Sequence, residues 1–287
     1  MKKIRNWKNF LLEYVDVKTL KYNIFDWDDN ILIMETPLHF QHFEDGKWVN
    51  KDITPFDFAQ IRKTHPTDYM DCNEWKGDKN YSFIEFRDFG PRGANAFIED
   101  VKKSIKDKKF GPSWEVFINT MKDGRLFAIV TTRGHEPGTI RSAIEYIINN
   151  VLTPEDRLKM EDNLKNFNEL FNIKTSDNDL ISQYLNCCYF MGLNSQAFID
   201  EFGYNPSGTK TNQGKQDAIN KFVNFVRAFA KRTKLPLKVG FSDDDINFSN
   251  AAQELFMRTE KSLDFPENFY VFNTSDAKLK GGVKVKI

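Results

Sequence analysis

The chain has 287 residues, of which 40% are apolar and 27 are phenylalanine, enough for a sizeable core in one large domain with or without an inserted module. Lysine plus arginine equals aspartate plus glutamate at 41 each, so no overall charge attracts nucleic acid or an anionic membrane. Three cysteines make no disulfide framework, which fits a reducing compartment. The apolar run behind the basic N-terminus is broken by acidic residues, and no window approaches the roughly 18 apolar residues of a membrane span, so we expect a cytoplasmic protein.

The first signal along the chain is an apolar, β-favouring run at residues 22–25 that leads into a cluster of carboxylates. Asp26, Asp28 and Asp29 follow it, and the chain returns to apolar residues at Ile31. Taken alone, this pattern is typical of a solvated acidic turn. At the end of a buried strand, however, each unpaired charge would cost on the order of several kcal/mol without a cation or hydrogen-bond donors.

The following segment predicts a β-hairpin, a further strand and a helix. Asp45-Gly46 is a strong turn signal between two extended stretches within residues 31–53. Residues 81–86 alternate like a strand, and apolar residues within 96–105 recur at helical spacing. The polar residues near the next Gly-Pro turn either face a substrate or solvate a loop, and we favour the loop; these are Arg87, Asp88 and Arg92.

A strand, a polar turn and a helix come next, which together indicate an α/β unit. Residues 114–122 predict a helix with Ser113 as its cap. The continuous apolar run 126–130 is typical of a strand that is buried on both faces, and Pro137 opens the helix that follows. Between them lies the polar turn Thr131-Thr132-Arg133-Gly134-His135.

The second half of the chain predicts a helical segment and then another α/β unit. Residues 152–203 are mostly helical in pattern, without a strand of comparable strength. A helix with Lys215 near its start follows, and then a short strand at 237–241. That strand ends in the acidic turn Ser242-Asp243-Asp244-Asp245, and a last strand is predicted at 269–272.

Three patterns that resemble known sites fail on detail. Residues 208–216 approach a phosphate-binding P-loop, but the glycines are one residue too far apart and a glutamine replaces the required Ser or Thr. Residues 243–254 approach a calcium-binding EF-hand loop, but Phe248 stands where glycine is needed. His39 and His42 lie three apart in a predicted strand and point to opposite faces, so they make a poor metal pair.

Three predicted strand ends thus carry an Asp-x-Asp pair, a threonine and a second aspartate cluster. Because ligands bind outside the carboxyl ends of strands in open parallel α/β sheets, we expect these ends to converge. Such a set suits phosphoryl transfer, in which one carboxylate attacks phosphorus and another donates and later accepts a proton. Magnesium would offset the crowded negative charge, and a lysine and a threonine hydroxyl would orient the phosphoryl oxygens.

The motifs resemble those of the haloacid dehalogenase-like (HAD) hydrolases. Phe25-Asp26-Trp27-Asp28 matches their first motif, and the later motifs are matched in order by Thr131-Thr132-Arg133, by Lys215 and by Ser242-Asp243-Asp244. The resemblance implies that Asp26 is the nucleophile and Asp28 the general acid/base. It also implies that the phosphate is bound by Thr131, Thr132 and Lys215, with Lys210 as the alternative lysine. The same resemblance implies that Mg²⁺ is bound by Asp26, Asp243 and Asp244 and by the backbone carbonyl of Asp28. One departure is Asn30, where the family usually has threonine, and this bears on the geometry of the turn more than on the carboxylates.

The resemblance also implies the architecture, an α/β protein with a Rossmann-like HAD core. The core would have a mostly parallel sheet flanked by helices and would comprise residues 1–36, 113–151 and 204–287. A cap-like segment with the β-hairpin (37–112) and a helical insertion (152–203) would interrupt it. In such proteins the insertions recognise the substrate.

We therefore expect a magnesium-dependent phosphatase that hydrolyses a small phosphorylated substrate through an aspartyl-phosphate. The alternative is a non-catalytic HAD-fold protein that binds a phosphorylated ligand or a protein partner. A phosphatase acting on nucleic-acid ends is a third possibility, which the balanced charge does not support. The sequence carries no signal for an oligomeric state.

Overall fold

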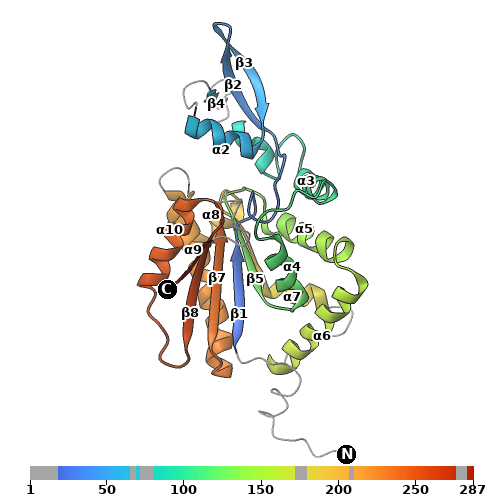
Figure 1. Cartoon of the computed structure of the whole chain (residues 1–287), viewed down its shortest axis with the longest axis vertical. Helices are drawn as coiled ribbons and strands as arrows, with labels where there is room; N and C mark the ends of the chain where they lie inside the picture. Colours follow the sequence, from blue (N-terminus) through green and yellow to red (C-terminus); the bar gives the residue numbers. More distant parts are fainter. Residues whose placement is uncertain (1–18, 65–68, 72–80, 172–179, 207–209, 276–282) are drawn as a thin grey trace, which may run out of the picture.

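The computed structural model describes residues 19–64, 69–71, 81–171, 180–206, 210–275 and 283–287. Most of these residues form an α/β body around a six-stranded sheet, and a smaller three-stranded sheet lies beyond one end of it (Figure 1). Residues 1–18 of the predicted core lie outside the described residues. None of the described helices is long and apolar enough to cross a membrane.

The main sheet is mostly parallel. Its strand order is β6-β5-β1-β7-β8-β9, and only β9 runs antiparallel to its neighbour. The strands are β1 (Leu20–Phe25), β5 (Phe127–Thr131), β6 (Tyr189–Gly192), β7 (Leu237–Asp243), β8 (Glu267–Asn273) and β9 (Val283–Lys286). Every residue of β5 is buried, as its continuous apolar run predicts for a strand covered on both faces.

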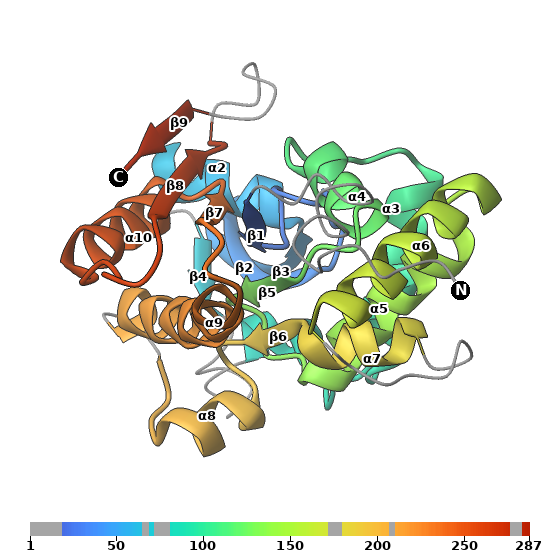
Figure 2. The ribbon, with the colours of Figure 1, turned by 90° about the horizontal axis from the view of Figure 1, so that it is seen from below.

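Helices cover both faces of this sheet. Seen along the strands, α9 and α10 lie on one face and α3 to α7 on the other (Figure 2). The helices are α3 (Asn95–Lys106), α4 (Trp114–Lys122), α5 (Pro137–Asn150), α6 (Pro154–Phe171), α7 (Leu180–Cys187), α8 (Gln196–Phe202), α9 (Thr211–Thr233) and α10 (Ile246–Arg258). The expected fold class, an α/β protein with a mostly parallel sheet flanked by helices, is confirmed at this level.

The smaller sheet has the order β3-β2-β4 and contains the predicted hairpin. It consists of β2 (Leu38–Glu44), β3 (Lys47–Ile53) and β4 (Tyr69–Asp71), with α2 (Pro55–Thr64) and the 3₁₀ helix η1 (Tyr81–Phe86) beside it. The hairpin turn has positive φ at Asp45 (50°) and Gly46 (79°), as a two-residue hairpin turn requires. Leu38, Phe40 and Ile53 form a small core of its own.

The prediction of a strand at residues 81–86 is wrong, because this stretch forms the 3₁₀ helix η1. The stretch is kinked at Phe83 (φ −112°, ψ 22°), between two helical turns, and Phe83 and Phe86 both pack against the small core.

Residues 152–203, predicted as a mostly helical insertion, contain α6, α7 and α8 and also a strand that the prediction missed. This segment contains β6, which pairs in parallel with β5 and completes one edge of the main sheet. In the segment 37–112, the three-stranded sheet forms a separate unit, whereas α3 packs beside α5 and places Phe97 and Val101 in the main core.

Candidate active site

The strand ends that carry the predicted site lie side by side in the sheet. The chain passes from β1 to β5 on one side of β1 and later to β7 on the other, so the strand order switches direction at β1. A crevice forms at such a switch point, outside the carboxyl ends of the strands. The backbone N–H of Asp26 donates to the carbonyl oxygen of Ser242 at 2.9 Å, which continues the pairing of β1 and β7 to the acidic residues.

Lys215 joins the two acidic strand ends. It lies in the second turn of α9, and its Nζ is 2.7 Å from Oδ1 of Asp26 and 2.5 Å from Oδ2 of Asp243. The side chains of Lys215 and Asp243 are each 1% exposed. The ring of Phe248 lies 4.1 Å from Nζ and adds a cation–π contact. The alternative lysine, Lys210, lies outside this contact, at the beginning of α9.

Three carboxyl groups lie close enough to bind one metal ion. Asp26, Asp243 and Asp244 each offer one oxygen, and these oxygens all lie within 4.8 Å of one another. Carboxylate oxygens are the ligands that Mg²⁺ prefers. The structure therefore brings together the three side chains among the residues expected at the metal. Asp28 is expected there through its backbone carbonyl, and its side chain binds another partner.

The three carboxyl groups of this cluster outnumber the one ammonium group, that of Lys215, which contacts two of them. Burial raises the pKa of Asp26 well above its usual value, with Lys215 opposing the shift and Asp243 adding to it. Burial also raises the pKa of Asp243, and burial together with the charges of Asp243 and Asp26 raises the pKa of Asp244 to about 9. Burial lowers the pKa of Lys215, but the two adjacent carboxylates raise it by more, so Lys215 stays protonated. A further cation would allow all three carboxyl groups to be ionised together.

Arg133 holds the carboxylate of Asp28. Its Nε donates to Oδ2 of Asp28 at 2.8 Å and its Nη2 donates to Oδ1 at 2.7 Å, a bidentate pair. The side chain of Arg133 is fully buried and that of Asp28 is 19% exposed. Sequence reasoning included Arg133 in a motif but gave it no role, because its partner lies 105 residues away in the chain.

The turn after Asp28 is built around Asn30. Asp29 has a φ of 53°, a left-handed conformation that aspartate tolerates better than most residues, and its N–H donates to the carbonyl of Leu32 at 2.9 Å. Asn30 is fully buried, and its Nδ2 donates to the carbonyl oxygens of Asp26 and Ser242, both at 3.1 Å.

The carbonyl group of the Asn30 side chain is satisfied as well. Its Oδ1 accepts hydrogen bonds from Ser113 at 2.7 Å and from Thr274 at 2.9 Å. Ser113 does stand at the N-terminus of α4, but its hydroxyl donates to Asn30 and makes no cap hydrogen bond, so the predicted capping role is wrong. Asn30 thus links the ends of β1 and β7 to the start of α4 and to the residue after β8.

The predicted threonines lie at the end of β5. Phe25 of β1 pairs with Ile129, which places the end of β5 beside the Asp26–Asp28 turn. Thr131 is fully buried, and its Oγ1 accepts a hydrogen bond from the backbone N–H of Arg133 at 3.3 Å. Thr132 is half-buried, and its carbonyl accepts from Asn194 at 2.5 Å.

Two residues expected to solvate a loop have structural partners instead. Asp88 accepts hydrogen bonds from the backbone N–H of Glu136 and the hydroxyl of Thr139, so it caps α5 from the inserted segment. It also lies 2.9 Å from Nδ1 of His135, a fully buried residue whose pKa is lowered by burial. Arg92 pairs with Asp100.

Other sequence candidates lie away from the acidic cluster. His39 and His42 pair with Asp52 and Glu44 on the hairpin, at 2.7 and 2.5 Å. Part of the P-loop-like stretch, 208–209, lies outside the described residues, and from Thr211 onward that stretch is helix α9.

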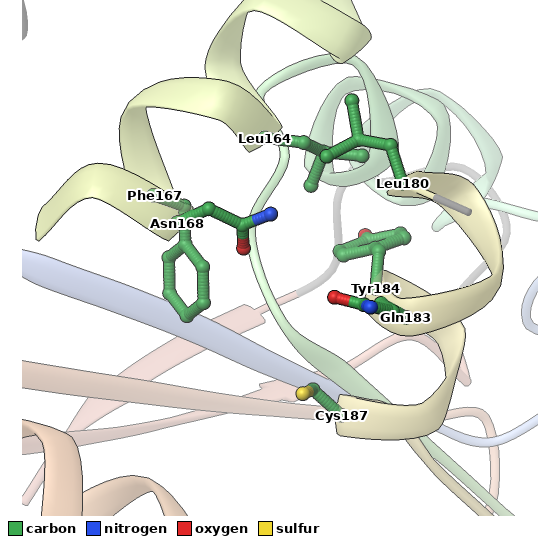
Figure 3. A pocket seen from close by; sticks show the side chains of 7 residues that line it. All are labelled: Leu164, Phe167, Asn168, Leu180, Gln183, Tyr184 and Cys187. Carbon is green, nitrogen blue, oxygen red and sulfur yellow. The ribbon is translucent and has the colours of Figure 1, made fainter. Parts of the chain in front are cut away.

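A small pocket between α6 and α7 has room for about one water molecule (Figure 3). It is lined by Leu164, Phe167, Asn168, Leu180, Gln183, Tyr184 and Cys187.

Comparisons with protein-family models, with curated proteins and with solved structures find no match to this chain. The function is therefore inferred from the geometry of the acidic cluster and its neighbours.

Proposed function

We propose that the protein is a magnesium-dependent phosphatase of the HAD-like type, which hydrolyses phosphoric monoesters through an aspartyl-phosphate on Asp26. The observation that carries the proposal is the contact of Lys215 with both Asp26 and Asp243, with Asp244 within metal-ligand distance. The set combines a nucleophile, a cation for phosphoryl oxygens and a carboxylate site for a divalent ion.

The proposed reaction has two halves. In the first, an oxygen of Asp26 attacks phosphorus, the bond from phosphorus to the ester oxygen breaks, and Asp28 gives its proton to the leaving oxygen. In the second, Asp28 takes a proton from water as that water attacks phosphorus. The bond between phosphorus and Asp26 then breaks, which releases inorganic phosphate and restores the free carboxylate.

Lys215 has two functions in this reaction. It stabilises the ionised form of Asp26 before attack, because its Nζ is 2.7 Å from Oδ1. It also faces the negative charge that the phosphoryl group brings to a buried site, where such interactions are stronger than in water. Because Asp243 holds the same Nζ, the lysine is fixed before substrate arrives.

The residues present fit a magnesium ion. Asp26, Asp243 and Asp244 would hold it, and it would neutralise charge on the carboxylates and on the phosphoryl oxygens. Next to them, burial and the charge of Asp28 raise the pKa of Asp29 to about 7. Its buried Oδ1 accepts no hydrogen bond from the described residues.

One observation favours the non-catalytic alternative. Both oxygens of Asp28 accept hydrogen bonds from Arg133. To donate and later accept a proton, Asp28 therefore has to use the second lone pair of one of these oxygens. A protein in which the pair blocks this exchange would bind phosphorylated ligands without hydrolysing them.

The test is phosphate release from an aryl phosphate and from a broad panel of phosphorylated metabolites, with Mg²⁺ present. We expect Asp26→Asn to abolish turnover, while Asp264→Asn, a change at an exposed residue paired with Lys234, retains it. Equal turnover in the wild type and Asp26→Asn contradicts the proposal. So does a wild type that is inactive on the whole panel, and ligand binding without turnover would then support the alternative.

A further inference from the structure

Arg133 is a fully buried cation whose role the proposed reaction has not yet explained. Its two hydrogen bonds to Asp28, at 2.8 and 2.7 Å, fix both the position and the plane of that carboxylate. A buried ion pair is a poor source of stability, because desolvation of the two charges offsets their attraction. Orientation of Asp28 accounts for the pair better than stability does.

Thr36, just before the predicted insertion 37–112, and two rings within that insertion hold Arg133 in place. The guanidinium carbon lies 4.2 Å from the ring centroid of Phe86, at the end of η1, and 5.2 Å from that of Phe97 in α3. Nη2 also donates to the hydroxyl of Thr36 at 2.9 Å, just before β2. The planar group is therefore restrained by rings and by a hydroxyl from segments outside β5.

A second layer of contacts fixes Thr36. Its hydroxyl donates to Oδ2 of Asp100 at 2.7 Å, and Nη1 of Arg92 donates to the same oxygen at 3.0 Å. A continuous chain of hydrogen bonds thus runs from Asp28 through Arg133, Thr36 and Asp100 to Arg92.

We infer that Arg133 is a positioning residue through which Thr36 and the segment 37–112 hold Asp28 in the orientation needed for proton transfer. This inference rests on the proposed function. Because its Nε and Nη2 are taken up by Asp28 and Thr36, and two phenylalanine rings lie against its guanidinium, Arg133 acts through Asp28 and does not touch the substrate. Lysine cannot replace it, because an ammonium group does not bind both carboxylate oxygens in one fixed plane.

A comparison of substrates with different leaving groups distinguishes this positioning role from a merely structural one. An alkyl phosphate needs a proton on its leaving oxygen, whereas nitrophenolate leaves without one. If Asp28 is displaced, the first half-reaction therefore slows more for an alkyl phosphate than for nitrophenyl phosphate. A misplacement of about 1 Å typically costs about 100-fold. We expect Arg133→Lys to lower kcat/KM by about 100-fold for an alkyl phosphate and by less than about 10-fold for nitrophenyl phosphate.

The chain offers a matched control. Arg227 makes the same two-pronged contact with buried Glu267, at 2.7 and 2.8 Å, but at the amino end of β8. We expect Arg227→Lys to leave the ratio of the two kcat/KM values unchanged. In an Asp28→Asn background, Arg133→Lys should cause no further loss on nitrophenyl phosphate, because its effect acts through Asp28.

A second variant, Thr36→Val, tests the inference if Arg133→Lys fails to fold. Thr36→Val removes the hydroxyl that accepts from Arg133 but keeps the pair with Asp28, and we expect a smaller change in the same direction. Equal losses on both substrates in Arg133→Lys and Thr36→Val overturn the inference, as does a further loss on nitrophenyl phosphate in the Asp28→Asn background. In either case the activity of the wild type leaves the proposed function standing. Absence of Asp26-dependent turnover in the wild type overturns both.

Discussion

The side-chain amide of Asn30 donates to the carbonyl oxygen of Ser242, 212 residues further along the chain, at 3.1 Å. The same nitrogen donates to the carbonyl of Asp26. One side chain thus binds the residue before Asp243 and the nucleophile candidate itself. It sets the spacing of the two strand ends whose carboxylates would share one cation.

Asn30→Asp should destabilise the protein, because it replaces two buried donors by an oxygen that faces carbonyl groups. We expect a loss of about 3 kcal/mol in the free energy of unfolding, measured by urea denaturation. Asn224→Asp, on an exposed part of α9, is the matched control and should stay within about 0.5 kcal/mol of the wild type. Equal stability of the two variants would show that the Asn30 hydrogen bonds do not contribute to the free energy of unfolding.

Lys215→Met should remove the cation shared by Asp26 and Asp243. We expect the rate of phosphate release to fall by about 100-fold or more, because the phosphoryl oxygens lose a positive partner in a buried site. Lys210→Met is the control, since Lys210 lies at the beginning of α9, near the ring of Tyr204. If Lys210→Met causes the larger loss, the assignment of the phosphate lysine is wrong.

Without metal, stability should fall as pH rises. The pKa of Asp244 is raised to about 9 and that of Asp29 to about 7, in both cases first by burial, from an ordinary value of 3.8. Above that ordinary value the unfolded chain loses these protons while the folded protein keeps them. The free energy of unfolding therefore decreases with pH until each folded pKa is passed.

Added Mg²⁺ should reverse this trend, because a cation binds the ionised carboxylates and competes with their protons. We expect the increase in Tm on adding Mg²⁺ to be larger at pH 9 than at pH 6. In Asp244→Asn both the pH slope and the Mg²⁺ effect should shrink, whereas Asp264→Asn should keep them. A Mg²⁺ effect that is independent of pH would count against a metal site at these carboxylates.

Gly111→Ala should disturb the turn that carries Asp26 to Asn30. A Cβ at Gly111 would lie 2.5 Å from the carbonyl carbon of Asn30, so the backbone has to move. We expect a loss of about 1 to 3 kcal/mol in unfolding free energy. Gly138→Ala is the matched control, because its Cβ meets nothing within 4 Å in α5 and should leave stability equal or slightly higher.

Local patterns were sufficient to locate the strand ends of the candidate site. Asp26 and Asp243 each follow a short apolar run, and such runs with carboxylates at their ends are visible without any tertiary information. The helix around Lys215 shows the same kind of local periodicity. The proximity of these residues then depends on parallel pairing of β1 with β7, which the α/β pattern predicts in general terms.

Elements that depend on distant partners were missed. β6 has only four residues, and its strand conformation comes from pairing with β5. Apolar and polar residues are interspersed in η1, and Phe83 and Phe86 both pack against the small core. In both cases tertiary contacts decide between conformations that the local sequence permits about equally.

The sequence by itself determined the residue types at the site, the strands that present them and the α/β class, because each follows from periodicity within a few residues. Only the tertiary structure decided how the polar groups pair. Asp28 pairs with Arg133 across 105 residues and Asn30 with Ser242 across 212. Such hydrogen bonds depend on the positions and orientations of whole elements, and a linear pattern carries no measure of either.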